Sequence, residues 1–139
     1  MSPLPTWNEP KVFRLKEIAH FRDEQFVNEH LFDGDGFYGR LLCFQWGQHV
    51  PEHVHEHIDE TFDVLEGEGT FLINGREVKA GPGTTLYIPA GTYHALRADG
   101  TDRWIIRETV HERVYLRRAL RLVGRAFLKR LPGIGHRWR

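Results

Sequence analysis

Residues 47–67 read GQHVPEHVHEHIDETFDVLEG, and this stretch decides the fold. His53 and His55 are two positions apart, so on an extended chain both imidazoles point to the same side. If the chain turns at Ile58-Asp59, then Glu60 begins the neighbouring antiparallel strand and faces the same interior. The stretch therefore predicts two imidazoles and one carboxylate on one inner face of a sheet.

A fourth polar side chain completes this set further along the chain. His94 follows Pro89-Ala90-Gly91, a tight turn that can bring another strand back beside the first pair. Three imidazoles and one carboxylate bind a divalent first-row metal and leave one or two positions open. This set of donors fits Fe, Mn, Ni or Zn equally. The single cysteine, Cys43, excludes a disulfide within the chain and any metal site built from several thiolates.

Turn signals recur on both sides of residues 47–67 and predict the fold class. After Gly47, short apolar or alternating runs are separated by Gly-, Pro- and Asn-Gly-containing turns, including Asn74-Gly75, a type I′ hairpin signal. Before it, Asp33-Gly34-Asp35-Gly36 separates two apolar runs in residues 25–46. About nine strands with no helix between them predict an all-β antiparallel sandwich or barrel and exclude a parallel α/β fold.

The two ends of the chain differ from this central part. The first ten residues contain three prolines and predict an extended arm, which residues 12–15 follow as a strand and residues 16–24 as a helical turn. Residues 114–131 place apolar side chains three or four positions apart among arginines, the pattern of a basic amphipathic helix. The 139 residues therefore divide into a barrel with its arm and hairpin, 1–111, and a basic helix and tail, 112–139, packed on the barrel or on a partner.

The charge is also distributed unequally along the chain, with a change of sign after residue 102. Residues 1–102 carry 8 Lys/Arg and 17 Asp/Glu, whereas residues 103–139 carry 11 and 2. A basic helix is also compatible with an acidic membrane surface or a nucleic acid. Both partners are disfavoured, because no nucleic-acid-binding motif accompanies the helix and its apolar stripe is most simply covered by protein.

The spacing of the glycines, prolines and histidines resembles the two sequence motifs of the cupin superfamily. Gly47, His53, His55, Glu60 and Gly67 fit the first motif, and Gly83, Pro89-Ala90-Gly91 and His94 fit the second, with a 15-residue spacer between them. Ala98 stands where the second motif commonly closes with Asn, which is not a metal ligand in the family. The resemblance implies a small double-stranded β-helix, or jelly-roll barrel, with one metal bound inside by His53, His55, Glu60 and His94.

The strand alternation also predicts the wall of a substrate pocket. Phe62, Val64 and Leu96 share inward parity with Glu60 and His94. In the strand before Gly47, either the alternate residues that include Tyr38 and Arg40 face this pocket, or the residues between them do. If the first set faces inward, Arg40 and Tyr38 can orient an anionic or phenolic substrate.

The functional expectation is a metal-dependent enzyme acting on a small organic substrate, a dioxygenase first and an isomerase or lyase second. The alternative is a non-catalytic small-molecule or sugar-binding sensor, because one fold hosts many functions. His49 is expected to be a loop residue and His57 a rim residue, and His57 is the first candidate to replace one of the four metal ligands. Cys43 is expected to be a buried apolar residue. A homodimer is expected, and a cytoplasmic location, because the N-terminus lacks the pattern of a signal peptide.

Overall fold

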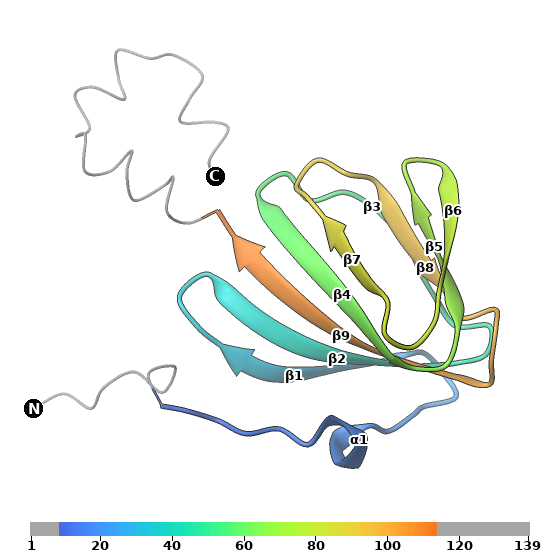
Figure 1. Ribbon diagram of the computed structural model, residues 1–139, viewed down its shortest axis with the longest axis horizontal. Helices are drawn as coiled ribbons and strands as arrows, with labels where there is room; N and C mark the ends of the chain where they lie inside the picture. Colours follow the sequence, from blue (N-terminus) through green and yellow to red (C-terminus); the bar gives the residue numbers. More distant parts are fainter. Residues whose placement is uncertain (1–8, 114–139) are drawn as a thin grey trace, which may run out of the picture.

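The computed structural model describes residues 9–113, which form a short helix and nine antiparallel strands in two sheets (Figure 1). The helix is α1 (Leu15–Ile18). The strands are β1 (Val27–Asp33), β2 (Phe37–Gln45), β3 (His49–His53), β4 (Ile58–Glu66), β5 (Gly69–Ile73), β6 (Arg76–Ala80), β7 (Thr85–Ile88), β8 (His94–Arg97) and β9 (Arg103–Glu112). The predicted all-β antiparallel class is confirmed.

The two sheets divide the strands unequally. One sheet has the order β1-β2-β9-β4-β7 and the other the order β3-β8-β5-β6. Strands far apart in the sequence are neighbours, since β9 pairs with both β2 and β4. The chain therefore crosses between the sheets repeatedly, as in a double-stranded β-helix.

Both predicted hairpins form where the turn residues place them. Residues 34–36 join β1 to β2, and Gly36 has a φ of 69°. Asn74 and Gly75, with φ of 48° and 81°, join β5 to β6, and Ile73 pairs with Arg76 across them. Positive φ at both central residues is the signature of the type I′ turn that Asn-Gly predicts.

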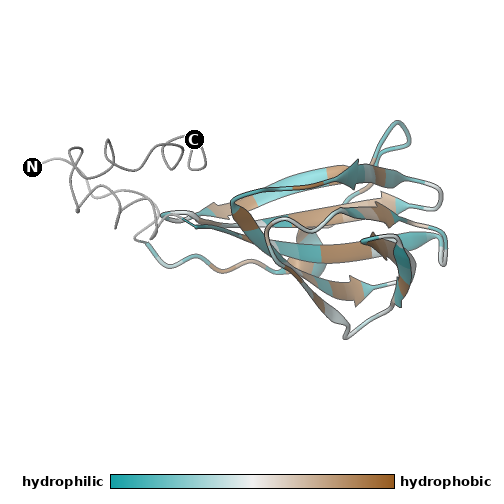
Figure 2. Ribbon diagram, turned by 90° about the horizontal axis from the view of Figure 1, so that it is seen from above, coloured by the Kyte–Doolittle hydropathy of each residue, from teal (hydrophilic) through white to brown (hydrophobic). Residues whose placement is uncertain are grey.

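An apolar core fills the space between the sheets. Its largest side chains are Trp104, Phe44, Phe62 and Phe71, which are at most 1% exposed. The indole N–H of Trp104 donates a hydrogen bond of 3.2 Å to the Ala80 carbonyl, so its polar atom is satisfied in this core. Along the strands, apolar and polar residues alternate, as the brown and teal bands of Figure 2 show.

A second apolar cluster lies on the opposite face of the five-stranded sheet. Leu41 and Cys43 of β2 pack there with Val27, against Phe13 and Ile18 of the N-terminal segment. The structure places no strand at residues 12–15 and limits the helix to four residues, so both expectations for this segment were inaccurate. The segment is held by its apolar contacts with the sheet.

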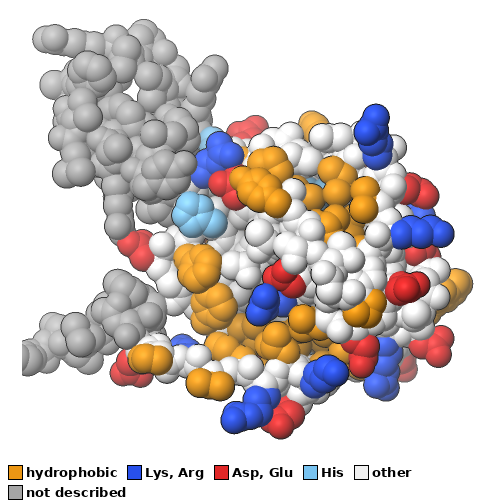
Figure 3. All heavy atoms as spheres, in the orientation of Figure 1, with side chains coloured by type: hydrophobic (Ala, Val, Ile, Leu, Met, Phe, Trp, Pro, Cys, Tyr) orange, Lys and Arg blue, Asp and Glu red, His pale blue; other side chains and the backbone are white. Residues whose placement is uncertain are grey.

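Two further expectations fall on residues that the structure does not describe. The proline-rich arm lies mostly in residues 1–8, and the basic amphipathic helix lies in residues 114–139. Both therefore stay predictions, as does the division at residue 111. Among the described residues, no helix is long and apolar enough to cross a membrane. On the face drawn in Figure 3, acidic and basic side chains are interspersed around the barrel.

Candidate metal centre

Two of the predicted ligands face each other across a strand pair. His53 is the last residue of β3 and pairs in register with His94, the first residue of β8. Their rings have centroids 4.2 Å apart. His55 lies beyond the end of β3 in an irregular segment, so the reason given for its orientation, one continuous strand, was wrong. The backbone instead leaves the sheet and carries His55 over the end of the barrel.

Glu60 reaches the cluster from the other sheet. It lies on β4, which pairs with β7 and β9 and not with β3. The expected antiparallel pairing of the strands on either side of Ile58-Asp59 is therefore corrected. The chain crosses between sheets at residues 54–57, so the cluster bridges the two layers.

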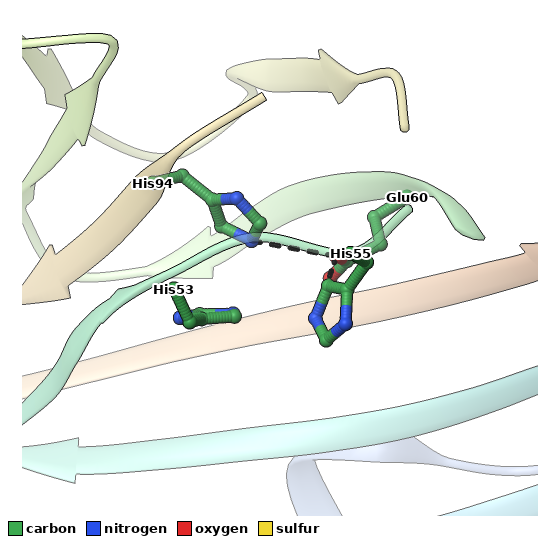
Figure 4. Close-up of side chains that lie close together, drawn as sticks. All are labelled: His53, His55, Glu60 and His94. Carbon is green, nitrogen blue, oxygen red and sulfur yellow. Dashed lines mark ion pairs between the residues drawn. The ribbon is translucent and has the colours of Figure 1, made fainter. Parts of the chain in front are cut away.

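The four side chains converge on one point (Figure 4). One ligand atom from each of His53, His55, Glu60 and His94 lies within 4.8 Å of the other three. The Nε2 atoms of His55 and His94 are each 3.3 Å from Glu60 Oε1. Glu60 and His94 are 4% and 1% exposed, whereas the His55 side chain is 37% exposed, so the cluster opens to solvent on the His55 side.

Backbone carbonyls fix the tautomers of two of these histidines. Nδ1 of His53 lies 2.8 Å from the Pro51 carbonyl oxygen, and Nδ1 of His94 lies 2.9 Å from that of Thr92. A carbonyl oxygen only accepts, so each Nδ1 donates and each neutral ring keeps a lone pair on Nε2. This is the arrangement that metal-binding histidines use.

The buried Nε2 of His94 is the clearest sign that the cluster lacks a partner. It makes no hydrogen bond, although Glu60 Oε1 lies 3.3 Å away. Buried polar atoms are nearly always paired, and a cation shared with Glu60 satisfies both groups. The residues therefore fit a divalent metal.

The pKa values of two clustered histidines move in opposite directions. Burial lowers the pKa of His55, and the neighbouring His53, His94 and Arg40 lower it further against the opposing effect of Glu60. Burial also acts to lower the pKa of His94, but the Glu60 carboxylate and the Thr92 carbonyl outweigh it and raise that pKa. Proton and metal therefore compete at these rings, and the metal is favoured as the pH rises.

The inner face of β2 is now defined. Leu42 and Phe44 belong to the core between the sheets, whereas Leu41 and Cys43 belong to the cluster on the opposite face. By strand alternation, Tyr38 and Arg40 share the inner face with Leu42. Of the other predicted wall residues, Phe62, Val64 and Leu96 are at most 2% exposed and are packed in the core.

A further carboxylate faces the same interior and was missed in the sequence. Glu108 on β9 is only 7% exposed and lies in register with Arg40 on one side and Phe62 on the other. Burial, together with the charge of Glu60, raises its pKa to about 7, although Arg40 and His94 oppose the shift. The available signal was parity, since Glu108 is two and four positions after the buried Ile106 and Trp104.

The remaining histidine and cysteine expectations concern residues outside the cluster. His57 is near Glu56, at 3.9 Å, and is not among the clustered residues. His49 is also outside the cluster, but it is the first residue of β3, so its expected loop position was wrong. A cavity of about 370 Å³ lies beside the cluster and is bordered by His55, His57 and Glu112. Cys43 is fully buried, and burial raises the pKa of its thiol, as befits an apolar packing residue.

Two antiparallel sheets with three imidazoles and one carboxylate gathered between them define a double-stranded β-helix with a possible metal site. The chain belongs to the cupin family, because its sequence matches the Cupin domain over residues 40–106 and a solved relative is similar over nearly its whole length. That relative, an RmlC-like cupin protein from Desulfovibrio desulfuricans, is 32% identical with a TM-score of 0.68, covering 74% of this chain and 97% of its own.

Two more proteins are similar to this chain. The protein TT1209 from Thermus thermophilus is 25% identical with a TM-score of 0.69, over 73% of this chain and 96% of that one. Among curated proteins, quercetin 2,3-dioxygenase of Bacillus subtilis is 42% identical over 53 residues, which are 38% of this chain. The match spans only 16% of that enzyme's length, so it concerns one portion of a larger protein.

Proposed function

We propose that this protein is a metal-dependent enzyme of the dioxygenase type that acts on a small organic substrate. The observation that carries the proposal is the convergence of His53, His55, Glu60 and His94 within 4.8 Å, with the buried Nε2 of His94 lacking a hydrogen bond. These four residues would hold a divalent transition metal, which would supply redox or Lewis-acid chemistry. Fe, Mn, Ni and Zn are the candidates.

The dioxygenase assignment rests on the match between a segment of this chain and quercetin 2,3-dioxygenase. The segment that is 42% identical belongs to a protein named quercetin 2,3-dioxygenase, and an RmlC-like cupin protein shares the fold of this chain. The local similarity supports oxygen chemistry for this chain. Because the matched segment is short, the substrate class is left as a small organic molecule.

The residues of this chain have separate tasks in the proposed site. The carbonyls of Pro51 and Thr92 orient two imidazoles before any ligand arrives, which lowers the entropic cost of binding. Phe62, whose ring centroid lies 6.1 Å from that of His94, excludes water from the core side. With Val64 and Leu96 it forms the apolar floor, and Tyr38 and Arg40 form the polar inner wall.

Metal analysis followed by oxygen uptake tests the proposal. Protein from the native host is analysed for its metal, and metal-free protein is then reloaded separately with Fe(II), Mn(II), Ni(II) and Zn(II). Each form is supplied with a catechol, a flavonol, a β-diketone and a small thiol, and oxygen consumption is recorded. We expect one metal per chain and uptake with one substrate class, absent in the His55→Ala variant.

The other outcomes identify the alternatives. Substrate turnover without oxygen consumption would assign an isomerase or lyase and overturn the dioxygenase proposal. A tightly bound metal with no turnover of any compound would favour a ligand-binding module.

We also propose a homodimer, because β1, β7, β3 and β6 are edge strands of the described sheets and edges are commonly covered. Light scattering on the full chain decides this, and a monomeric mass would contradict it. The cytoplasmic location stays a prediction.

A further inference from the structure

The inner face of the five-stranded sheet carries an arginine that the metal cluster does not use. Arg40 on β2 is in register with Glu108 on β9, which is in register with Phe62 on β4. Neighbouring strands are about 4.8 Å apart, so the backbone at Arg40 is about 10 Å across the sheet from the strand that carries Glu60.

The guanidinium of Arg40 is held in place, but its hydrogen-bonding capacity is unused. Its Nη1 lies 3.8 Å from Glu108 Oε1, beyond hydrogen-bond distance, and its Cζ lies 5.0 Å from the centroid of the Tyr38 ring. Arginine has five N–H donors, and within residues 9–113 none of those of Arg40 makes a hydrogen bond.

The environment of Arg40 differs from that of the arginines on the outer surface. Arg107 and Arg97 each donate hydrogen bonds to Asp or Glu side chains that satisfy them. The Arg40 side chain is 35% exposed, so a ligand can reach it from solvent, yet it lies beside the 10% exposed side chain of Glu108. A planar guanidinium in such a position binds a carboxylate through two parallel hydrogen bonds.

We propose that Arg40 binds a carboxylate group of the substrate, so that the enzyme selects small organic acids whose other end reaches the metal cluster. This inference rests on the proposed function, because it takes the cluster as the reacting centre. Glu108 and Tyr38 are positioning residues that hold the guanidinium. With Glu108 beside it, the local charge favours a singly charged carboxylate over a doubly charged phosphate.

A pair of probes that differ only in charge tests the inference. Co(II)-loaded protein is titrated with 3,4-dihydroxybenzoate and with 3,4-dihydroxybenzamide, and binding is followed by calorimetry. Both probes carry the same two hydroxyls for the metal. We expect the acid to bind at least about tenfold more tightly than the amide, as a charge-assisted hydrogen-bond pair provides.

The variants separate recognition from folding. Arg40→Gln should reduce the preference for the acid over the amide to less than about twofold, whereas Arg40→Lys should keep part of the preference. Arg40→Gln combined with Glu108→Gln removes both charges and should lose the preference in the same way, which keeps the test valid if the single change perturbs the fold. Arg107→Gln, on the same sheet but paired with Asp63, is the matched control and should keep the full preference.

A metal-independent measurement keeps this inference distinct from the proposed function. In the metal-free protein, the Nε–H signal of Arg40 in ¹⁵N NMR spectra should shift with benzoate and not with benzamide. If the metal loads but acid and amide bind equally, or if the preference survives in Arg40→Gln, the inference is overturned while the metal site stands. If no metal loads, the proposed function fails, and the benzoate titration alone decides whether Arg40 binds a carboxylate.

Discussion

The His55 side chain is accessible to solvent, whereas its cluster partners Glu60 and His94 are buried. Its side chain touches solvent and the adjoining cavity, so its removal alters the ligand set without opening a hole in the core. His57, two positions later and 22% exposed, lies outside the cluster. The two residues form a matched pair for mutagenesis.

We expect His55→Ala to weaken metal binding by at least about a hundredfold, because even the outer partners of metal ligands contribute ten- to hundredfold. His57→Ala should bind metal as the parent does. Competition with a chromogenic chelator measures both affinities. One tightly held ion per chain in His55→Ala would contradict the assignment.

Glu108 gives the apoprotein a distinctive pH dependence. Its pKa rises from 4.5 in the unfolded chain to about 7 in the folded protein, so it stabilises the fold below pH 4.5 relative to high pH, and that stability is lost as the pH rises through 7. The full shift corresponds to roughly 3 kcal/mol as an upper bound. Deprotonation of this buried carboxyl therefore opposes folding at alkaline pH.

We expect Glu108→Gln to raise the free energy of unfolding of the metal-free protein by about 2 kcal/mol at pH 8 and to leave it nearly unchanged at pH 5. Urea denaturation at the two pH values measures the difference. Glu52→Gln, at an exposed position of β3, is the control and should show no such pH dependence. Equal effects at both pH values would mean that Glu108 titrates normally.

At the scale of elements, the turn between β4 and β5 explains one glycine of the cupin pattern. Gly67 has a φ of 75°, and a Cβ atom added there would overlap the Arg103 carbonyl oxygen. Gly75 has a φ of 81°, but a Cβ atom there would meet nothing within 4 Å. Both positions have a positive φ, but only position 75 has room for a Cβ atom.

We therefore expect Gly75→Ala to lower the free energy of unfolding by about 1 kcal/mol and Gly67→Ala by about 3 kcal/mol, since only the second adds a clash to the positive φ. Denaturant titration of both variants gives the comparison. Equal losses would show that the turn shifts away from Arg103 at little cost.

Local signals predicted the elements whose formation depends on neighbouring residues. The Asp33–Gly36 and Asn74-Gly75 turns specify φ directly, so both hairpins were placed correctly. The end of β3 at His53 was not foreseen, because His53-Val54-His55 alternates as a strand does while the crossover to the other sheet ends the pairing there. Pairing between distant strands, such as β2 with β9, has no local signal.

The four clustered residues were predictable because their types and spacing are unusual together. Glu108 was not, since a single glutamate in a strand is ordinarily a solvent-facing residue. Its parity with Trp104 and Ile106 does not by itself identify the inner face, which is defined by the pairing of β9 between β2 and β4. The sequence also left open whether the Arg40 side chain points into the barrel. The four residues after Arg40 are all buried, so apolar and polar residues do not alternate there.

At the scale of the whole molecule, the cluster joins the two sheets. His53 and His94 belong to the four-stranded sheet and Glu60 to the five-stranded one. A ligand bound only by the folded protein stabilises it by about 4 kcal/mol at a thousandfold excess over its dissociation constant. Metal removal should therefore lower the melting temperature of the whole domain.

We expect EDTA to lower the melting temperature of the metal-loaded protein by several degrees, and the added metal to restore it, because both sheets lose their shared ligand. Differential scanning calorimetry measures the shift. His55→Ala should melt at the same temperature with and without EDTA. A parent protein insensitive to EDTA would argue against a metal shared between the sheets.

The position of Cys43 offers a reporter built into the molecule. The thiol is fully buried in the apolar cluster against which Phe13, Leu15, Ile18 and Phe21 pack, on the side of the sheet away from the metal cluster. Cys43 is the sole cysteine of the chain, and it reacts with an alkylating reagent only when the residues packed over it move away from the sheet. The rate of Cys43 labelling, followed by mass spectrometry, therefore measures this local opening separately from metal binding.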